Sequence, residues 1–213
     1  RFDAANGLPG APVTAMIPAT AGGIWLGTQD GQILREQNGK FISIPAAENF
    51  GERAVLALFE NGRGQLWIGS DGGGLTCLTN NANGGGAMNW DASRGLPGNT
   101  VAGVVEDGAK NLWLATDMGI YRVNHADVRR SLENARVPLA FQLMSEAATA
   151  PESATIFGGP RAALSPDGEL WFATSEGVLN VDTHSSEANP SAFPLYLESA
   201  AFNGQPPISL LRC

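Results

Sequence analysis

The sequence has little of what metal sites and thiol chemistry require. It contains two cysteines and two histidines in 213 residues, and neither Cys77 nor Cys213 stands in a CxxC or other metal-ligand spacing. The sequence therefore predicts no metal site and no cofactor. Whether the two cysteines are free thiols or form a disulfide stays open, because an exported protein could still pair them.

Positive charge is also scarce. The chain carries 13 Lys and Arg residues against 21 Asp and Glu residues, a formal net charge of −8. Such a chain repels the phosphate backbone of nucleic acids and the anionic surface of membranes. We therefore exclude nucleic acid as a partner.

Long hydrophobic runs are absent. No apolar run approaches the roughly 18 residues that a membrane-spanning helix needs. The sequence opens with Arg1-Phe2-Asp3 instead of a basic start followed by an apolar signal core. We expect any targeting signal, and any contact with a membrane, to come from segments outside this chain.

Glycine and proline, in contrast, are abundant. The 27 glycines and 13 prolines are spread between short apolar runs and are not pooled in one tract. This distribution is typical of many short strands joined by tight turns. It predicts an all-β fold.

A five-residue pattern occurs four times: an aliphatic residue, Trp, an apolar residue, Gly or Ala, then Thr or Ser. The tryptophans are 42, 46 and 58 residues apart, and a glycine stands six residues after each. Repeats of about 40 to 50 residues indicate propeller blades. The tryptophans are Trp25, Trp67, Trp113 and Trp171.

Each repeat predicts a four-stranded antiparallel blade. In the third copy, residues 101–105, an acidic-glycine turn and residues 112–116 form a hairpin, and a third strand follows the glycine. Residues 41–44 and 88–90 are the expected outer strands of the first two blades. The longer last interval contains residues 125–134, which predict a short helix with its arginines in water.

The repeated tryptophans are predicted to be core residues. A large flat side chain on the second strand of every blade, two positions before Gly or Ala, fills the wedge between neighbouring sheets. The alternative is a stacked aromatic platform for a ligand. We favour the core because a binding aromatic is seldom needed in every repeat at the same position.

A second signature, aromatic-Asp-x-x-x-Gly-Leu-Pro-Gly, occurs at residues 2–10 and 90–98. Proline cannot donate to a strand ladder, so this segment is interpreted as the crossing from an outer strand to the next inner strand.

The repeat pattern ends near Val181. A polar linker at 182–190 follows, and the new apolar alternation at 193–202 predicts a strand outside the propeller. We assign residues 1–188 to propeller blades and 189–213 to a linker and the start of another domain.

These two signatures resemble the two-component regulator propeller repeat family over residues 2–181. The segment from Pro194 to Gly204 resembles the first strand of the immunoglobulin-like triple-tyrosine domain that follows such propellers. The resemblance implies the periplasmic sensor part of a bacterial sensor or hybrid histidine kinase, a homodimer in the full receptor. It also implies that about four blades belong to a seven-bladed ring, although a closed four-bladed ring is the alternative.

Candidate catalytic residues are few. His125 lies in the predicted helix and His184 in the linker, and neither is near a repeated Ser or Cys that could act as nucleophile. Residues 165–171 resemble the Asp box of sialidases, but Asp167 and Gly168 adjoin where that motif has one residue between them. We interpret this segment as an ordinary turn and predict no catalytic residues.

One rim of the propeller is the predicted ligand site. Turns between second and third strands share that rim with the loops entering the first strands, so their carboxylates could accept hydrogen bonds from sugar hydroxyls or hold a cation. The alternative is that Asp and Gly serve only the tight turns. The predicted rim residues are Asp30, Asp71, Arg94, Asn99, Asp117 and Glu176.

The sequence therefore predicts a sensory module that binds a small polar ligand, such as an oligosaccharide, without chemistry. Two other classes stay open: a propeller-fold carbohydrate-active enzyme, either a lyase or a glycoside hydrolase, and a structural interaction scaffold. A glycosidase would need two placed carboxylates with tuned pKa values. Turn acids alone do not show that arrangement.

Overall fold

The computed structural model describes residues 2–44, 53–79, 86–146, 161–174, 177–183, 199–200 and 208–209. The chain divides into two compact units, Arg1–Thr183 and His184–Cys213. The first unit contains the four repeats.

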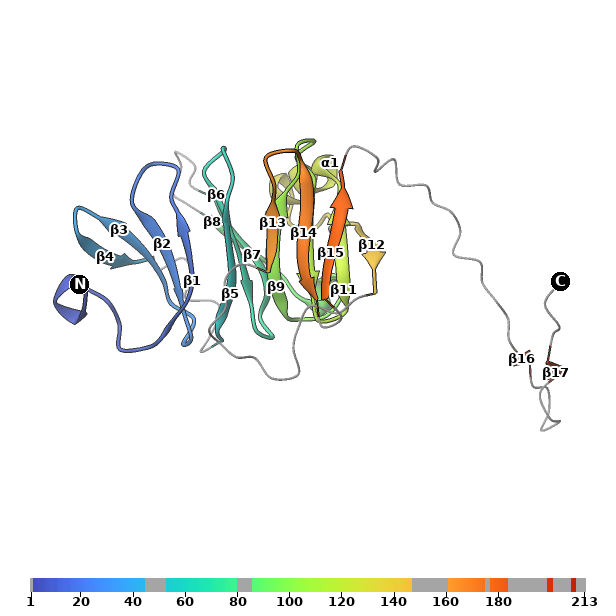
Figure 1. Cartoon of the computed structure of the whole chain (residues 1–213), viewed down its shortest axis with the longest axis horizontal. Helices are drawn as coiled ribbons and strands as arrows, with labels where there is room; N and C mark the ends of the chain where they lie inside the picture. Colours follow the sequence, from blue (N-terminus) through green and yellow to red (C-terminus); the bar gives the residue numbers. More distant parts are fainter. Residues whose placement is uncertain are drawn as a thin grey trace. The chain divides into compact units, whose positions relative to one another are not determined.

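The first unit consists of four antiparallel sheets, one for each repeat (Figure 1). This confirms the predicted all-β propeller of four-stranded blades, with three described strands in the fourth. The blades are: blade one, β1 (Val13–Pro18), β2 (Ile24–Thr28), β3 (Ile33–Gln37) and β4 (Lys40–Ser43); blade two, β5 (Val55–Glu60), β6 (Gln65–Ser70), β7 (Gly74–Thr79) and β8 (Gly86–Trp90); blade three, β9 (Val101–Glu106), β10 (Leu112–Thr116), β11 (Gly119–Val123) and β12 (Phe141–Ser145); blade four, β13 (Ala162–Leu164), β14 (Glu169–Thr174) and β15 (Gly177–Asp182). Strand β12 was not among the predicted strands, because the helical insertion separates it from β11.

An acidic-glycine turn closes the β9–β10 hairpin as predicted. Between β9 and β10 the Asp107 carboxylate accepts a hydrogen bond from the backbone N–H of Asn111, 2.9 Å away. Lys110 in the same turn adopts a left-handed φ of 70°. This turn fixes the register that places Trp113 opposite Val105.

The blades pack face to face through side chains that alternate along each strand. In β6, Leu66 and Ile68 join an apolar cluster with Ile33 of blade one. Trp67 stands between them, points the other way and joins a cluster with Leu112 of blade three. Strand β6 therefore presents one face to the preceding blade and one to the following blade.

The glycine two positions after Trp25 and after Trp67 leaves room for the inner strand of the next blade to approach closely. A Cβ atom on Gly27 would lie 2.4 Å from the Cγ1 atom of Val55, and one on Gly69 would lie 2.4 Å from the backbone oxygen of Val101. Real Cβ atoms do not approach other atoms so closely. Glycine at these positions therefore sets the distance between neighbouring blades.

The four tryptophans all lie on second strands, as predicted, but their burial differs. Trp67 and Trp113 are completely buried, which confirms them as core residues. Trp25 is half-buried. The prediction is wrong for Trp171, which is 41% exposed because it lies on the face of blade four that no described sheet covers.

The copy of the second signature at 90–98 runs from the outer strand β8 to the inner strand β9, as predicted, and the copy at 2–10 leads into β1. Each contains a short 3-10 helix, η1 (Ala4–Asn6) or η3 (Ala92–Arg94), whose N-cap is the aspartate of the signature. After η3, Leu96 is buried in the core between blades two and three.

Helix α1 (His125–Glu133) confirms the predicted insertion, and Arg129 and Arg130 are 68% and 62% exposed. Asn124 caps its first turn by accepting from the N–H of Ala126. The buried hydroxyl of Ser131 accepts from the indole N–H of Trp90 at 3.2 Å, which fastens the helix to blade two.

In the second unit the structure describes one short antiparallel pair, β16 (Ser199–Ala200) and β17 (Ile208–Ser209). The rest of the strand predicted at 193–202 lies outside the described residues, as do His184 and Cys213. The immunoglobulin-like assignment and the domain boundary at residue 188 stay predictions.

Candidate functional site

Two of the predicted rim aspartates, Asp71 of blade two and Asp117 of blade three, accept hydrogen bonds from the same residue, Thr100. The hydroxyl of Thr100 donates to Asp71 Oδ1 at 3.2 Å, and its backbone N–H donates to Asp117 Oδ1 at 3.4 Å. The N–H of Gly72 donates to the same hydroxyl at 3.1 Å. Asp71 and Asp117 thus hold the entry to β9 against the turns that follow β6 and β10.

Asp30 lies in the equivalent turn of blade one, but its hydrogen bonds stay within that turn. Its carboxylate accepts from the hydroxyl of Thr28 and, at 2.8 Å, from the side-chain amide of Gln32. The Thr28 hydroxyl is the main reason that the pKa of Asp30 is lowered. These bonds match the interpretation of Asp30 as a turn residue.

Arg94, another predicted rim residue, supports the fold. Its guanidinium donates to the backbone oxygens of Asn89 and Ala135, the latter at 2.7 Å, and it lies 5.9 Å from the centre of the Trp90 ring. It therefore ties blade two to the segment after α1. Glu176, the remaining rim acid, lies outside the described residues.

A polar pocket of about 360 Å³ lies beside Asp71, between the β6–β7 turn and the crossing segment. We call it the rim pocket. Its lining residues are Arg53, Gly72, Gly73, Asn89, Asp91, Ser93 and Asn99. Of the predicted rim residues, Asn99 is the one that lines it.

Hydrogen bonds within the rim pocket fix its side chains while leaving some polar groups available. Asn99 accepts from the N–H of Ala92 at 2.8 Å through Oδ1, so its amide NH₂ group takes no part in that bond. The guanidinium of Arg53 donates to the backbone oxygen of Gly72. The pocket therefore offers N–H donors on two sides.

Asp91 supplies a negative charge to the rim pocket. Its Oδ1 atom accepts from the hydroxyl of Ser93 at 2.6 Å, and this bond is the main cause of its lowered pKa. Asp91 therefore stays ionised at neutral and mildly acidic pH. The pocket combines a fixed carboxylate with amide, hydroxyl and guanidinium groups.

Sequence reasoning missed most of this pocket. Asp91 and Ser93 lie in the segment that the sequence predicts to be a crossing between strands, and a residue that caps a turn is of the same type as one that contacts a ligand. Asn89 is part of the expected outer strand, and Arg53 stands in no repeated column. The doubled signature at 90–98 is the signal that could have located the pocket.

A second, largely apolar cavity of about 640 Å³ is lined by the innermost strands of all four blades, β1, β5, β9 and β13. Its polar lining side chains are Thr14 and Arg161. This axial cavity has fewer hydrogen-bonding groups than the rim pocket, so it is the weaker candidate for a polar ligand.

Several solved structures share the fold. The extracellular domain of a putative hybrid two-component system of B. thetaiotaomicron is 23% identical, with a TM-score of 0.56 over 82% of this chain and 22% of that one. A second such domain from B. thetaiotaomicron is 18% identical, with a TM-score of 0.57 over 80% of this chain and 22% of that one. Virginiamycin B lyase from Staphylococcus aureus is 14% identical, with a TM-score of 0.51 over 82% of this chain and 57% of that one.

No protein-family model matches the chain, and no curated protein matches it. The chain spans about a fifth of the length of the two-component system domains that it resembles. At these identities the likeness establishes a shared propeller fold.

Among the described residues, no helix is long and apolar enough to cross a membrane. The same residues contain no group of three or more His, Cys, Asp or Glu side chains placed to hold a metal ion.

Proposed function

We propose that this chain is the ligand-sensing propeller of a bacterial two-component receptor, located in the periplasm, and that it binds a small polar ligand such as an oligosaccharide. The observation that carries the proposal is the rim pocket, in which charged and neutral hydrogen-bonding groups from blade two and from the segment that enters blade three converge. The propellers of the B. thetaiotaomicron extracellular domains support the sensory role through their shared fold.

The chemistry of the rim pocket suits a polyhydroxylated ligand. Sugar hydroxyls both donate and accept, so they need donors and acceptors close together. Asn99 and Arg53 provide N–H donors, whereas the ionised Asp91 provides an acceptor. A volume of about 360 Å³ falls within the usual range of roughly 300 to 1,000 Å³ for small-molecule sites.

The position of the pocket suggests how binding is transmitted. Asn89 and Gly73 belong to blade two, while Asn99 lies on the segment that enters blade three. A ligand that contacts both parts favours one arrangement of the two blades over others. In the full receptor, which we propose to be a homodimer, this shift would pass through the linker at 182–190 to a histidine kinase output.

The test is calorimetric titration of a panel of neutral oligosaccharides against the chain and two variants. Asn99→Ala removes a pocket amide and should weaken binding about tenfold, the usual effect of losing one good hydrogen bond. Asn180→Ala is the matched control, because Asn180 is an exposed asparagine of blade four. Its affinity should equal that of the parent chain.

Equal affinity of the Asn99→Ala variant and the parent would contradict the rim-pocket assignment. Melting temperatures separate a binding defect from a folding defect, since Asn99 also accepts from Ala92. Asp71→Asn tests the adjoining contact to Thr100. It should weaken binding less, because Asp71 positions the pocket wall without lining it.

A propeller enzyme is the second candidate, because the chain shares its fold with virginiamycin B lyase. In that lyase, a variant with one histidine replaced by alanine is catalytically inactive. Chromatography of the panel after prolonged incubation separates the two functions. Recovery of intact sugar supports sensing, whereas release of a product over multiple turnovers would establish an enzyme.

A further inference from the structure

A second polar pocket lies at the other end of strand β6 from the rim pocket. Gln65 begins β6 and lines this second pocket, whereas Gly72 follows the last residue of β6 and lines the rim pocket. The second pocket has a volume of about 350 Å³ and is lined by Arg63, Gln65, Thr79, His125, Val128, Arg129, Leu132 and Glu133. We call it the helix pocket, because five of these residues belong to α1.

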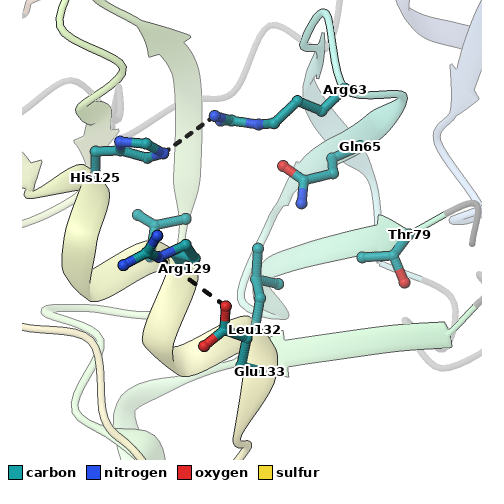
Figure 2. A pocket seen from close by; sticks show the side chains of 8 residues that line it. Arg63, Gln65, Thr79, His125, Arg129, Leu132 and Glu133 are labelled. Carbon is teal, nitrogen blue, oxygen red and sulfur yellow. Dashed lines mark hydrogen bonds and ion pairs between the residues drawn. The ribbon is translucent and has the colours of Figure 1, made fainter.

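Arg63 spans the gap between blade two and the helix. Its Nη1 atom lies 3.1 Å from His125 Nε2 (Figure 2). Its Nη2 atom donates to Glu106 at 2.7 Å. An arginine can only donate, so the imidazole accepts through an unprotonated Nε2. These two bonds hold one guanidinium in place at the edge of the pocket.

Arg129 supplies a second guanidinium that is only loosely held. Its Nε atom is 4.0 Å from Glu133 Oε1, and the two side chains are 68% and 69% exposed (Figure 2). An exposed pair one helical turn apart contributes little stability. The guanidinium of Arg129 is therefore free to turn toward a stronger partner.

The charge and the apolar surface of the helix pocket are complementary to one kind of ligand. Two guanidiniums face one lining carboxylate, and Glu106, which pairs with Arg63, also contacts Lys110 at 3.4 Å. The pocket is thus locally positive in a chain of net charge −8. Between the charged groups lie Val128, which is 4% exposed, and the half-buried Leu132.

We propose that the helix pocket binds a small organic carboxylate with an apolar body. The carboxylate bridges Arg63 and Arg129 through charge-assisted hydrogen bonds, which arginine forms in a planar two-pronged geometry. The apolar body packs on Val128 and Leu132, and Gln65 and Thr79 contact any polar substituent. This site does not depend on the function proposed for the rim pocket.

The test is calorimetric titration with 4-hydroxybenzoate, compared with 4-hydroxybenzamide, which has the same shape without the charge. We expect saturable binding of the carboxylate alone. Arg129→Gln should weaken it about tenfold, whereas Arg130→Gln is the matched control and should leave it unchanged. Arg130 is the next residue of the helix, is similarly exposed and pairs with Asp127, outside the pocket.

Three results would overturn the proposal: no saturable binding of the carboxylate, equal binding of the amide, or equal losses in the Arg129→Gln and Arg130→Gln variants. The Asn99→Ala variant of the rim pocket should bind 4-hydroxybenzoate like the parent chain. A loss in that variant would place the carboxylate in the rim pocket instead. The two binding proposals can therefore be refuted independently of each other.

Discussion

Trp113 and Trp171 occupy the same position of the repeat, yet one is completely buried and the other is 41% exposed. Trp113 packs against Leu170 and Phe172 of blade four. Those two residues alternate with Trp171 along β14, so Trp171 lies on the opposite face, with Ala173. The comparison shows that the repeated Trp becomes a core residue only through the blade that follows it.

The largest expected effect is the difference between two alanine substitutions. Trp113→Ala should lower the free energy of unfolding by about 3 to 5 kcal/mol, as large aromatic deletions in cores do. Trp171→Ala should cost less than about 1 kcal/mol, because its side chain is only partly withdrawn from water. Urea denaturation measures both. Similar losses in the two variants would show that Trp171 is also covered.

Hydrogen bonding distinguishes the covered interfaces from one another. The indole N–H of Trp113 donates to the buried Asp107 carboxylate at 2.8 Å, whereas the buried indole N–H of Trp67 has no partner in the described part of the chain. Asn61 takes the place of Asp107 in blade two. Its Oδ1 atom accepts from the backbone N–H of Gln65, and its NH₂ group, which can only donate, donates to the side chain of Gln65.

Asp107→Asn should therefore cost about 2 kcal/mol, since it replaces the carboxylate that accepts from the Trp113 indole by an amide. Urea denaturation of this variant measures the loss. The matched control is Asp167→Asn, at an exposed turn of blade four, which should change stability by less than about 0.5 kcal/mol. An unchanged denaturation midpoint for Asp107→Asn would mean that the bond to Trp113 contributes nothing.

The small residue after each Trp gives a third comparison between covered and open faces. Gly69→Ala should cost about 1 to 2 kcal/mol, because the added Cβ would approach the backbone oxygen of Val101 to 2.4 Å. Ala173→Val, at the equivalent exposed position of blade four, should be nearly neutral. Thermal unfolding of both variants checks the spacing role. An equally large loss at residue 173 would contradict it.

Thiol reactivity gives the mildest comparison. Cys77 on β7 pairs with Trp67 on β6 and is completely buried, and burial raises the pKa of its thiol to about 12. Below the unfolded-state pKa of about 8.5, the buried neutral thiol contributes to the stability of the fold. This contribution is lost as the pH rises toward 12. Asn180 pairs with Trp171 in the same way but is exposed.

In a Cys213→Ser background, native Cys77 should therefore resist an aromatic disulfide reagent at pH 8. The Asn180→Cys variant should react within minutes at its new cysteine. Absorbance of the released thiolate measures both reactions. Rapid reaction of native Cys77 would contradict its burial between blades two and three.

Periodicity made the blades predictable from the sequence, because one Trp, one glycine and one acidic turn recur at nearly fixed spacing. The burial of the individual tryptophans could not be read in the same way. Trp171 carries the same local signal as Trp113, and only the neighbouring sheet distinguishes them.

The candidate site was predictable only in part. The sequence located the correct turns, but Asp30, Asp71 and Asp117 use their carboxylates in bonds to nearby threonines. The rim pocket depends instead on Arg53 and Asn89, which are brought together by chain packing and follow no repeat. The helix pocket joins Arg63 to His125, 62 residues later, and no local pattern predicts that contact.

The most direct test of the account is amide chemical-shift mapping of the oligosaccharide that binds most tightly in the calorimetric panel. We predict that the largest amide chemical-shift changes occur at the rim-pocket residues Gly72, Gly73, Ser93 and Asn99, and that the sugar is recovered intact. Shifts confined to the innermost strands β1, β5, β9 and β13 would contradict it, because they would place the ligand in the axial cavity.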